Sequence, residues 1–129
     1  AATGRPRRVG PFDAVASAYG LKCQNADKIA LTKLDVLSRM DEIPVITAYK
    51  LNDELITEFD PLDDLDSMTP VIQTLPGWNT DISKCRKYEE LPENARKYIE
   101  TLEHLLNHEI QFISVGAERN QYLTKGEWL

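Results

Sequence analysis

Three arginines near the start of the chain form its densest group of ligand-binding residues. Arg5, Arg7 and Arg8 lie within four positions, directly after Gly4, where a glycine lets the backbone approach a ligand closely. A guanidinium group binds a carboxylate or a phosphate through two parallel hydrogen bonds. Two arginines on one loop therefore suit a dicarboxylate or a phosphorylated ligand. A solvated basic terminus, or a localisation-like patch, is the alternative interpretation of this cluster.

A second group follows a short apolar run at residues 32–35, with the sequence TKLD. The carboxylate of Asp35 could accept hydrogen bonds from the ring N–H and the exocyclic amino group of guanine, a donor pair that adenine lacks. The stem of Lys33 could lie along the base. Residues 114–116 (SVG) follow another apolar run and could pack against the same base. A strand followed by an Asp-capped helix is the alternative.

Two histidines and an acidic run are candidate metal ligands. His104 and His108 have a spacing that can place two imidazoles on one metal, but no third His or Cys lies nearby in the sequence. Residues 58–66 carry five acidic side chains but lack the spacing and the glycine of an EF-hand loop. We therefore predict no metal site and interpret the acidic run as a solvated loop.

The composition limits the class of protein. The chain has 129 residues, 42% of them hydrophobic, which suffices for the core of one ordinary domain. Its net charge of -6 disfavours nucleic acid and anionic membranes as partners, because both bind positive surfaces. Cys23 and Cys85 lack the spacing of a disulfide framework or a zinc site, which indicates incidental thiols without a nucleophilic role. No apolar run reaches the roughly 18 residues of a membrane span, and we expect a cytoplasmic protein.

The elements that would position these groups follow from hydrophobic spacing. Pro11 and Asp13 can begin a helix that runs to about Leu21. Its broad apolar face would comprise Val15, Ala16, Ala18 and Tyr19. Residues 28–32 predict a short buried strand, which would deliver the TKLD group at its carboxyl end, where ligands bind in open α/β sheets.

The remaining elements complete a predicted α/β fold. Residues 45–51 and 54–59 alternate around an Asn52-Asp53 turn, which predicts a β-hairpin. A loop or a poorly ordered short helix should follow at 60–70, then a strand at 71–75, a turn in which Trp78 covers an edge of the core, and an irregular stretch. Helical spacing predicts a helix that begins at Pro92 and continues to Leu106, before a strand at 110–115. We expect a mostly parallel sheet with helices on its faces, plus the antiparallel hairpin.

Seven motifs occur in the order and at the intervals typical of one enzyme family: TGRPRR, FDAVA, ALTKLDVL, DEIPV, TLPGW, YEELP and ISVGAER. The chain resembles the adenylosuccinate synthetases over essentially all of its length. The resemblance implies a ligase of purine biosynthesis that uses GTP to phosphorylate IMP, which L-aspartate then attacks. It also implies Mg²⁺, a homodimer in the cytoplasm, and a carboxy-terminal segment of a larger P-loop-NTPase-like enzyme.

The same resemblance assigns the site residues. The loop at residues 1–8 would bind aspartate through Ala1, Ala2, Thr3, Gly4, Arg5, Pro6 and Arg7. Arg5 would also contact IMP, and Arg7 would also contact GTP. The remaining GTP contacts would come from Lys33, Leu34, Asp35, Ser114, Val115 and Gly116.

The family's catalytic groups, its phosphate-binding Gly-Lys loop and its magnesium ligand belong to an amino-terminal part that this sequence does not contain. We therefore expect no catalytic or metal-binding residue here, and an inactive chain in isolation. The absence of an initiating Met and the position of the arginines also suggest a piece of a longer protein. Ala2, Val9 and Pro11 depart from the family's common residues. A stand-alone guanine-nucleotide-binding or regulatory module, or a basic-tailed interaction protein, are the alternatives.

Overall fold

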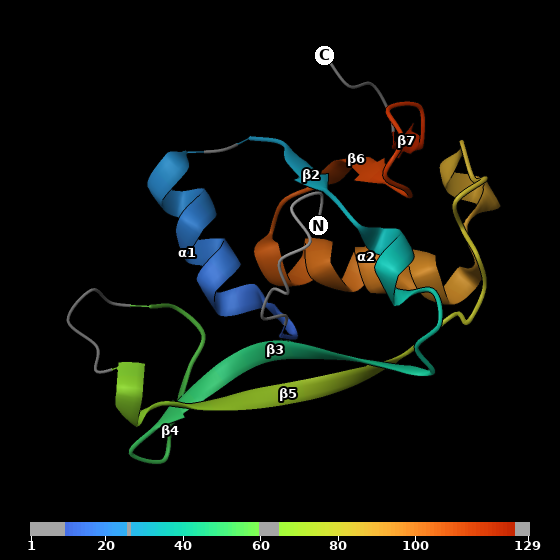
Figure 1. Ribbon diagram of the computed structural model, residues 1–129. Helices are drawn as coiled ribbons and strands as arrows, with labels where there is room; N and C mark the ends of the chain where they lie inside the picture. Colours follow the sequence, from blue (N-terminus) through green and yellow to red (C-terminus); the bar gives the residue numbers. More distant parts are fainter. Residues whose placement is uncertain (1–9, 26, 60–64, 126–129) are drawn as a thin grey trace, which may run out of the picture.

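The computed structural model describes residues 10–25, 27–59 and 65–125, which form a mixed α/β fold with two small sheets and two α-helices (Figure 1). The first sheet contains β1 (Phe12–Asp13), β3 (Glu42–Leu51), β4 (Glu54–Ile56) and β5 (Thr69–Pro76). The second sheet contains β2 (Ile29–Leu31), β6 (Ile110–Ser114) and β7 (Tyr122–Thr124). The helices are α1 (Ala14–Gln24) and α2 (Glu93–Leu106), and three short 3₁₀ turns are η1 (Leu34–Leu37), η2 (Leu65–Ser67) and η3 (Tyr88–Glu90).

Helix α2 provides most of the helical contribution to the core. Its buried face comprises Ala95, Tyr98, Ile99, Leu102 and Leu106, which recur at helical spacing. The helix ends at Asn107, whose left-handed backbone lets its N–H group reach the carbonyl groups of Glu103 and His104. The predicted helix is confirmed, with Pro92 as its N-cap residue rather than its first residue.

Helix α1 is also confirmed, but its buried face differs from the prediction. Asp13 caps the helix, because its Oδ1 accepts a hydrogen bond from the Ala16 N–H group at 2.9 Å. The structure buries Ala14 and Val15 and leaves Ala16 and Tyr19 exposed. Small apolar residues occur all around this helix, so spacing alone does not define a buried face.

The first sheet contains the predicted hairpin and a longer strand pairing. Asn52 and Asp53 have φ angles of 52° and 67°, as a type I′ turn requires. β4 is short, and the principal partner of β3 is β5, which runs antiparallel from the Glu42–Pro76 pair to the Lys50–Thr69 pair. Residues 60–64 of the predicted acidic loop lie outside the described residues, and η2 follows them.

The second sheet corrects two predictions. β2 pairs with β6 in parallel, and β6 pairs with the unpredicted β7 in antiparallel fashion. Both sheets are therefore mixed in the described residues, not mostly parallel. β2 is only half-buried and Ala30 is exposed. The reason is that, among the described residues, β2 lies at an edge of the sheet and has β6 as its neighbour on one side only.

The core lies where α2, β3 and the second sheet meet. Val45, Ile99 and Ile113 have no exposed surface. Trp78 is buried beside Tyr98, as its predicted place at the edge of the core requires. Gly77 allows this arrangement, because a side chain at that position would overlap the Met40 carbonyl group. Among the described helices, none is both long and apolar enough to cross a membrane.

Candidate functional site

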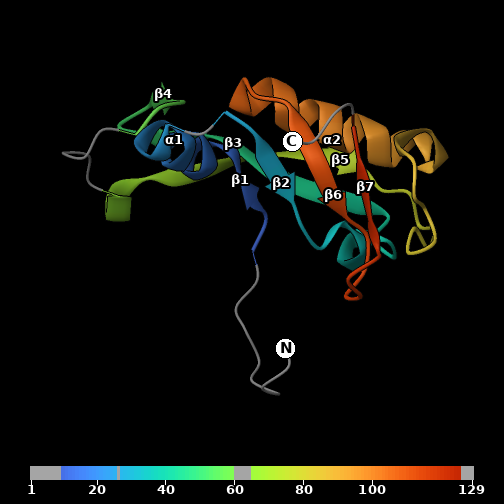
Figure 2. The same ribbon diagram turned by 90° about the horizontal axis from the view of Figure 1, so that it is seen from above.

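The parallel pairing of β2 with β6 brings the two candidate guanine-binding groups to the same edge of the sheet. Leu31 lies opposite Ile113 in the register, so the chain continues into residues 32–35 beside residues 114–116. Figure 2 shows β2, β6 and β7 side by side, with η1 at the end where β2 finishes. We call residues 32–38 the Asp35 segment and residues 114–121 the Gly116 segment.

The Asp35 segment is anchored by two buried side chains, Leu34 and Ser38. Leu34 is 1% exposed and belongs to the core. Lys33 precedes it with a φ of 61°, a left-handed conformation that turns the chain sharply after β2. Ser38 ends the segment, buried, and its Oγ accepts a hydrogen bond from Trp78 Nε1 at 3.4 Å. The core thus fixes both ends of η1.

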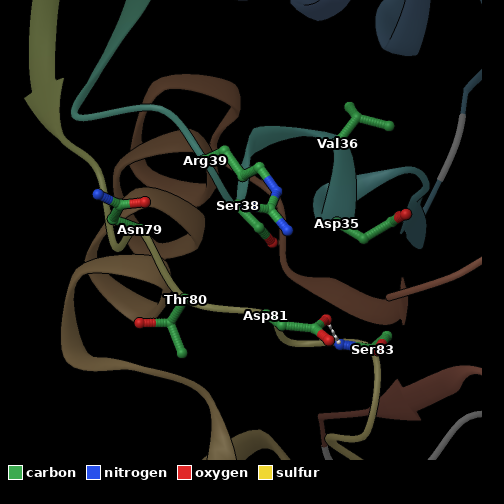
Figure 3. A pocket seen from close by; sticks show the side chains of 8 residues that line it. All are labelled: Asp35, Val36, Ser38, Arg39, Asn79, Thr80, Asp81 and Ser83. Carbon is green, nitrogen blue, oxygen red and sulfur yellow. Dashed lines mark hydrogen bonds between the residues drawn. The ribbon is translucent and has the colours of Figure 1, made fainter.

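Asp35 presents its carboxylate from this fixed turn. The residue is half-buried, and its side chain has no hydrogen bond or ion pair within the described part of the chain. In Figure 3, Asp35 and Arg39 extend in different directions from the same segment. A half-buried carboxylate without a partner among the described residues is suited to accept hydrogen bonds from a ligand.

A hollow of about 460 Å³ lies between η1 and the segment that follows Trp78 (Figure 3). Its lining comprises Asp35, Val36, Ser38, Arg39, Asn79, Thr80, Asp81 and Ser83. The Asp81 carboxylate accepts a hydrogen bond from the Ser83 N–H group at 2.9 Å. Hydrogen bonds from Ser83, with smaller contributions from Lys84 and Arg39, lower the pKa of Asp81. The opposite wall of the hollow therefore carries a carboxylate that is already engaged.

Two polar side chains of the Gly116 segment, those of Ser114 and Gln121, bond to groups of the protein. Ser114 Oγ donates to the Gly116 carbonyl oxygen at 3.1 Å, and the Val115 N–H group donates to the Gln121 carbonyl oxygen at 2.9 Å. The N–H groups of Gly116 and Ala117 have no acceptor among the described residues. Next to the end of β6 the segment therefore offers backbone donors to a ligand, because the Ser114 hydroxyl is already engaged.

The two segments offer different hydrogen-bonding groups at the same edge of the sheet, a carboxylate acceptor on Asp35 and backbone donors on Gly116 and Ala117. A carboxylate accepts hydrogen bonds from adjacent ring and exocyclic N–H groups, while backbone N–H groups donate to a carbonyl oxygen. Guanine carries these groups on its Watson–Crick edge, and adenine carries an amino group where guanine has the carbonyl oxygen. The side chains of Leu34 and Val115 are not accessible to a ligand, because both are buried in the core. These two residues could contact a base only through their backbone.

The described residues include only some of the other predicted groups. Residues 1–7, including Arg5 and Arg7, lie outside the described residues. Among the described residues, no three His, Cys, Asp or Glu side chains gather into a metal-binding group. Burial, and next the charge of Glu90, raise the pKa of the Cys85 thiol, which disfavours the nucleophilic thiolate. Cys23 and Cys85 are both free.

Sequence reasoning missed the opposite wall of the hollow and the role of Gln121. Asn79, Asp81 and Ser83 follow Trp78 in a stretch without regular spacing. The signal for this wall was the TLPGW motif itself, because Gly77 holds the following residues against Met40 and Asp41. Gln121 carries no signal in sequence, since its contacts with Ser83 join positions 38 residues apart.

This mixed α/β fold, with polar turns after adjacent parallel strands, has known counterparts. The family model of adenylosuccinate synthetase matches residues 1–123. The chain therefore belongs to the adenylosuccinate synthetase family.

Individual relatives agree with this assignment. An adenylosuccinate synthetase of Staphylococcus saprophyticus is 42% identical over 128 residues, which are 98% of this chain and 30% of the relative. One from Desulforamulus reducens is 45% identical over 120 residues, 92% of this chain and 28% of the relative. A solved structure of fully ligated adenylosuccinate synthetase from Plasmodium falciparum has a TM-score of 0.87 at 40% identity and covers 95% of this chain and 30% of its own. The chain thus spans about 30% of the length of the relatives that it matches.

Proposed function

We propose that this chain is the carboxy-terminal, guanine- and aspartate-recognising segment of an adenylosuccinate synthetase, a GTP-dependent ligase that joins IMP and L-aspartate in purine biosynthesis. Membership of the family supports the reaction. The observation that carries the proposal is the register of β2 against β6, which sets the Asp35 segment beside the Gly116 segment. The products would be adenylosuccinate, GDP and phosphate.

The base of GTP would lie between the two segments. Asp35 would accept hydrogen bonds from the guanine N1–H and 2-amino groups, and the N–H groups of Gly116 and Ala117 would donate to O6. The exposed stem of Lys33 would cover one face of the ring. Leu34 and Val115 would support these groups from the core.

The remaining assignments rest on the family resemblance. Residues 1–7 would bind the aspartate substrate, with Arg5 also at IMP and Arg7 also at GTP, because paired guanidinium groups suit dicarboxylates and phosphates. They precede β1 in the sequence, and β1 pairs with β3 in register at Phe12 and Val45. Mg²⁺, the P-loop-like fold and the catalytic groups would belong to the rest of the protein.

The assembly and the location of the protein are part of the same proposal. The full-length enzyme would be a cytoplasmic homodimer with small-molecule substrates and without a nucleic-acid or membrane partner. The net charge of -6 supports the last point, because nucleic acids and anionic membranes bind positive surfaces.

A stand-alone guanine-nucleotide-binding module is the second candidate function. The carboxylate of Asp35 and the backbone donors of the Gly116 segment would serve such a module equally well. The reading frame upstream distinguishes the two functions. A Gly-Lys phosphate-binding loop a few hundred residues before Ala1 supports the ligase, whereas a start codon near Ala1 supports the module.

The deciding experiment compares guanine and adenine nucleotides in the full-length protein. We expect GTP-dependent synthesis of adenylosuccinate by the unaltered protein. Asp35→Ala should lower kcat/KM for GTP by about 100-fold, because the N1–H and 2-amino groups of guanine would lose their acceptor. Asp66→Ala is the matched control, since Asp66 is exposed on η2. Equal use of ATP and GTP by the unaltered protein would contradict the proposal.

A further inference from the structure

Gln121 joins three parts of the molecule, two through its side chain and one through its backbone. Its Oε1 accepts a hydrogen bond from the Glu118 N–H group at 2.9 Å. Its Nε2 donates to the Ser83 carbonyl oxygen at 3.4 Å, a longer and weaker bond. Its backbone carbonyl accepts from the Val115 N–H group at 2.9 Å. One half-buried residue thus links the start of the Gly116 segment, its bend and the wall of the hollow.

The contact between Gln121 and Gly116 explains why a glycine stands at this position. A Cβ atom at residue 116 would overlap the carboxamide group of Gln121. The backbone of Gly116 is not in the left-handed region, so its conformation alone does not require glycine. An alanine here would therefore act by displacing the Gln121 carboxamide and breaking its hydrogen bonds.

Ser83, the more distant partner of Gln121, is itself held in place. Its N–H group donates to Asp81 Oδ1 at 2.9 Å, and its carbonyl oxygen also accepts from Arg86 Nη1 at 2.8 Å. Asp81 and Ser83 line the hollow together with Asp35. Through Ser83, Gln121 fixes the Gly116 segment relative to the surface that holds the Asp35 carboxylate.

We propose that Gln121 is a positioning residue for guanine recognition, which holds the N–H groups of Gly116 and Ala117 in register with Asp35 without touching the nucleotide itself. The inference rests on the proposed function, because it concerns the same base. A site that is held in its binding geometry before the ligand arrives avoids the cost of ordering it. Loss of Gln121 would therefore weaken GTP binding and leave the chemical step unchanged.

The first test uses steady-state kinetics of the full-length synthetase that carries this segment. Gln121→Leu should raise the KM for GTP about tenfold, as expected for the loss of two hydrogen bonds. The kcat and the KM values for IMP and aspartate should stay within about twofold. Gln111→Leu is the matched control, because the Gln111 side chain donates to Glu109, and it should leave all four constants unchanged.

A double-mutant cycle provides the second test, and it does not depend on one variant folding well. Gly116→Ala should raise the KM for GTP in the unaltered enzyme, because the new methyl group displaces Gln121. In a Gln121→Ala background the same change should have a much smaller effect, since the overlap is gone. Equal effects of Gly116→Ala in both backgrounds overturn the inference.

Two further outcomes separate this inference from the proposed function. If Asp35→Ala raises the KM for GTP and Gln121→Leu does not, the positioning role is wrong and guanine recognition stands. If Asp35→Ala leaves the preference for GTP over ATP unchanged, the proposed guanine site itself is wrong. A Gln121→Leu enzyme with a lower melting temperature and equal rises in all three KM values has lost only structure, and this too overturns the inference.

Discussion

The Asp35 segment and the Gly116 segment follow neighbouring parallel strands, yet they use their polar groups in opposite ways. Asp35 keeps its carboxylate without a partner in the described part of the chain, whereas Ser114 and Gln121 bond within their own segment and to its neighbours. The first segment therefore offers a side chain and the second offers its backbone. A single substitution can change ligand specificity where a side chain makes the contact. Where the backbone makes the contact, specificity changes only when the segment moves.

The same hydrophobic core nevertheless supports both segments. Leu34 and Val115 have at most 1% of their surface exposed, and both belong to the same core cluster. Each segment thus has a fully buried apolar side chain beneath the groups that it offers to a ligand. The comparison predicts that substitutions of the buried residues Leu34 and Val115 alter stability. Substitutions that affect the groups offered to a ligand should instead alter ligand binding.

Removal of the anchor of the Asp35 segment should have the largest effect. Leu34→Ala should lower the free energy of unfolding by about 2–5 kcal/mol, because it leaves a cavity in a closely packed core. Urea denaturation of the chain measures this change. Val36→Ala, at a side chain that is 65% exposed, should change it by less than about 0.5 kcal/mol. Equal effects of the two variants would contradict the assigned anchor.

A change of donor pattern at Asp35 should redirect specificity without loss of stability. Asp35→Asn adds an amide donor that can pair with the C2 carbonyl group of xanthine, while the amide oxygen still accepts from N1–H. We expect the ratio of activity with xanthosine triphosphate to activity with GTP to rise by roughly 100-fold. Competition between the two nucleotides in the full-length enzyme measures this ratio. An unchanged ratio would show that Asp35 does not contact the base.

Alkaline pH should lower the free energy of unfolding through Tyr98. This residue packs beside Trp78, which bonds to Ser38 at the end of the Asp35 segment. Burial raises the pKa of Tyr98 to about 12, so in the folded chain this tyrosine keeps its proton at a pH where the unfolded chain has lost it. Stability from this group is fully present below about pH 10 and is lost as the pH rises towards 12. Tyr98→Phe should therefore reduce the fall in stability between pH 9 and 11 by about 1 kcal/mol. Identical pH profiles for both proteins would contradict this role of Tyr98.

The smallest expected effect concerns the internal bond of the Gly116 segment. Ser114→Ala removes the hydrogen bond from Ser114 Oγ to the Gly116 carbonyl oxygen, and we expect a roughly threefold rise in the KM for GTP. Ser67→Ala on η2 is the control. A change as large as that at Asp35 would mean that the Ser114 hydroxyl contacts the nucleotide directly, and the contrast between the two segments would then fail.

The sequence predicted those elements whose cause is local. Helical spacing from Ala95 to Leu106 predicted α2, and turn chemistry at Asn52 and Asp53 predicted the hairpin. The TKLD group could be found for the same reason, because a short apolar run precedes it directly. In each case, neighbouring residues in the chain are also neighbours in the fold.

The missed features depend on partners that are distant in the chain. β7 is three residues long and exists through its pairing with β6. The exposure of Ala16 and Tyr19 on α1 depends on which face meets β3 and α2. The hollow needs the contact of Gly77 with Met40, between residues 37 positions apart. Spacing along one segment cannot encode such contacts.

The half-exposed strand β2 has a further consequence for the behaviour of the chain. In the described residues it pairs on one side with β6 and has no strand on its other side, and an unpaired strand edge can accept a strand from another chain. This edge is three residues long, with Lys28 before it and Lys33 two residues after it. Lysines that flank a short edge discourage indiscriminate pairing. In the part of the chain that the structure describes, the unpaired side of β2 is thus suited to one short, well-matched strand, not to open-ended association.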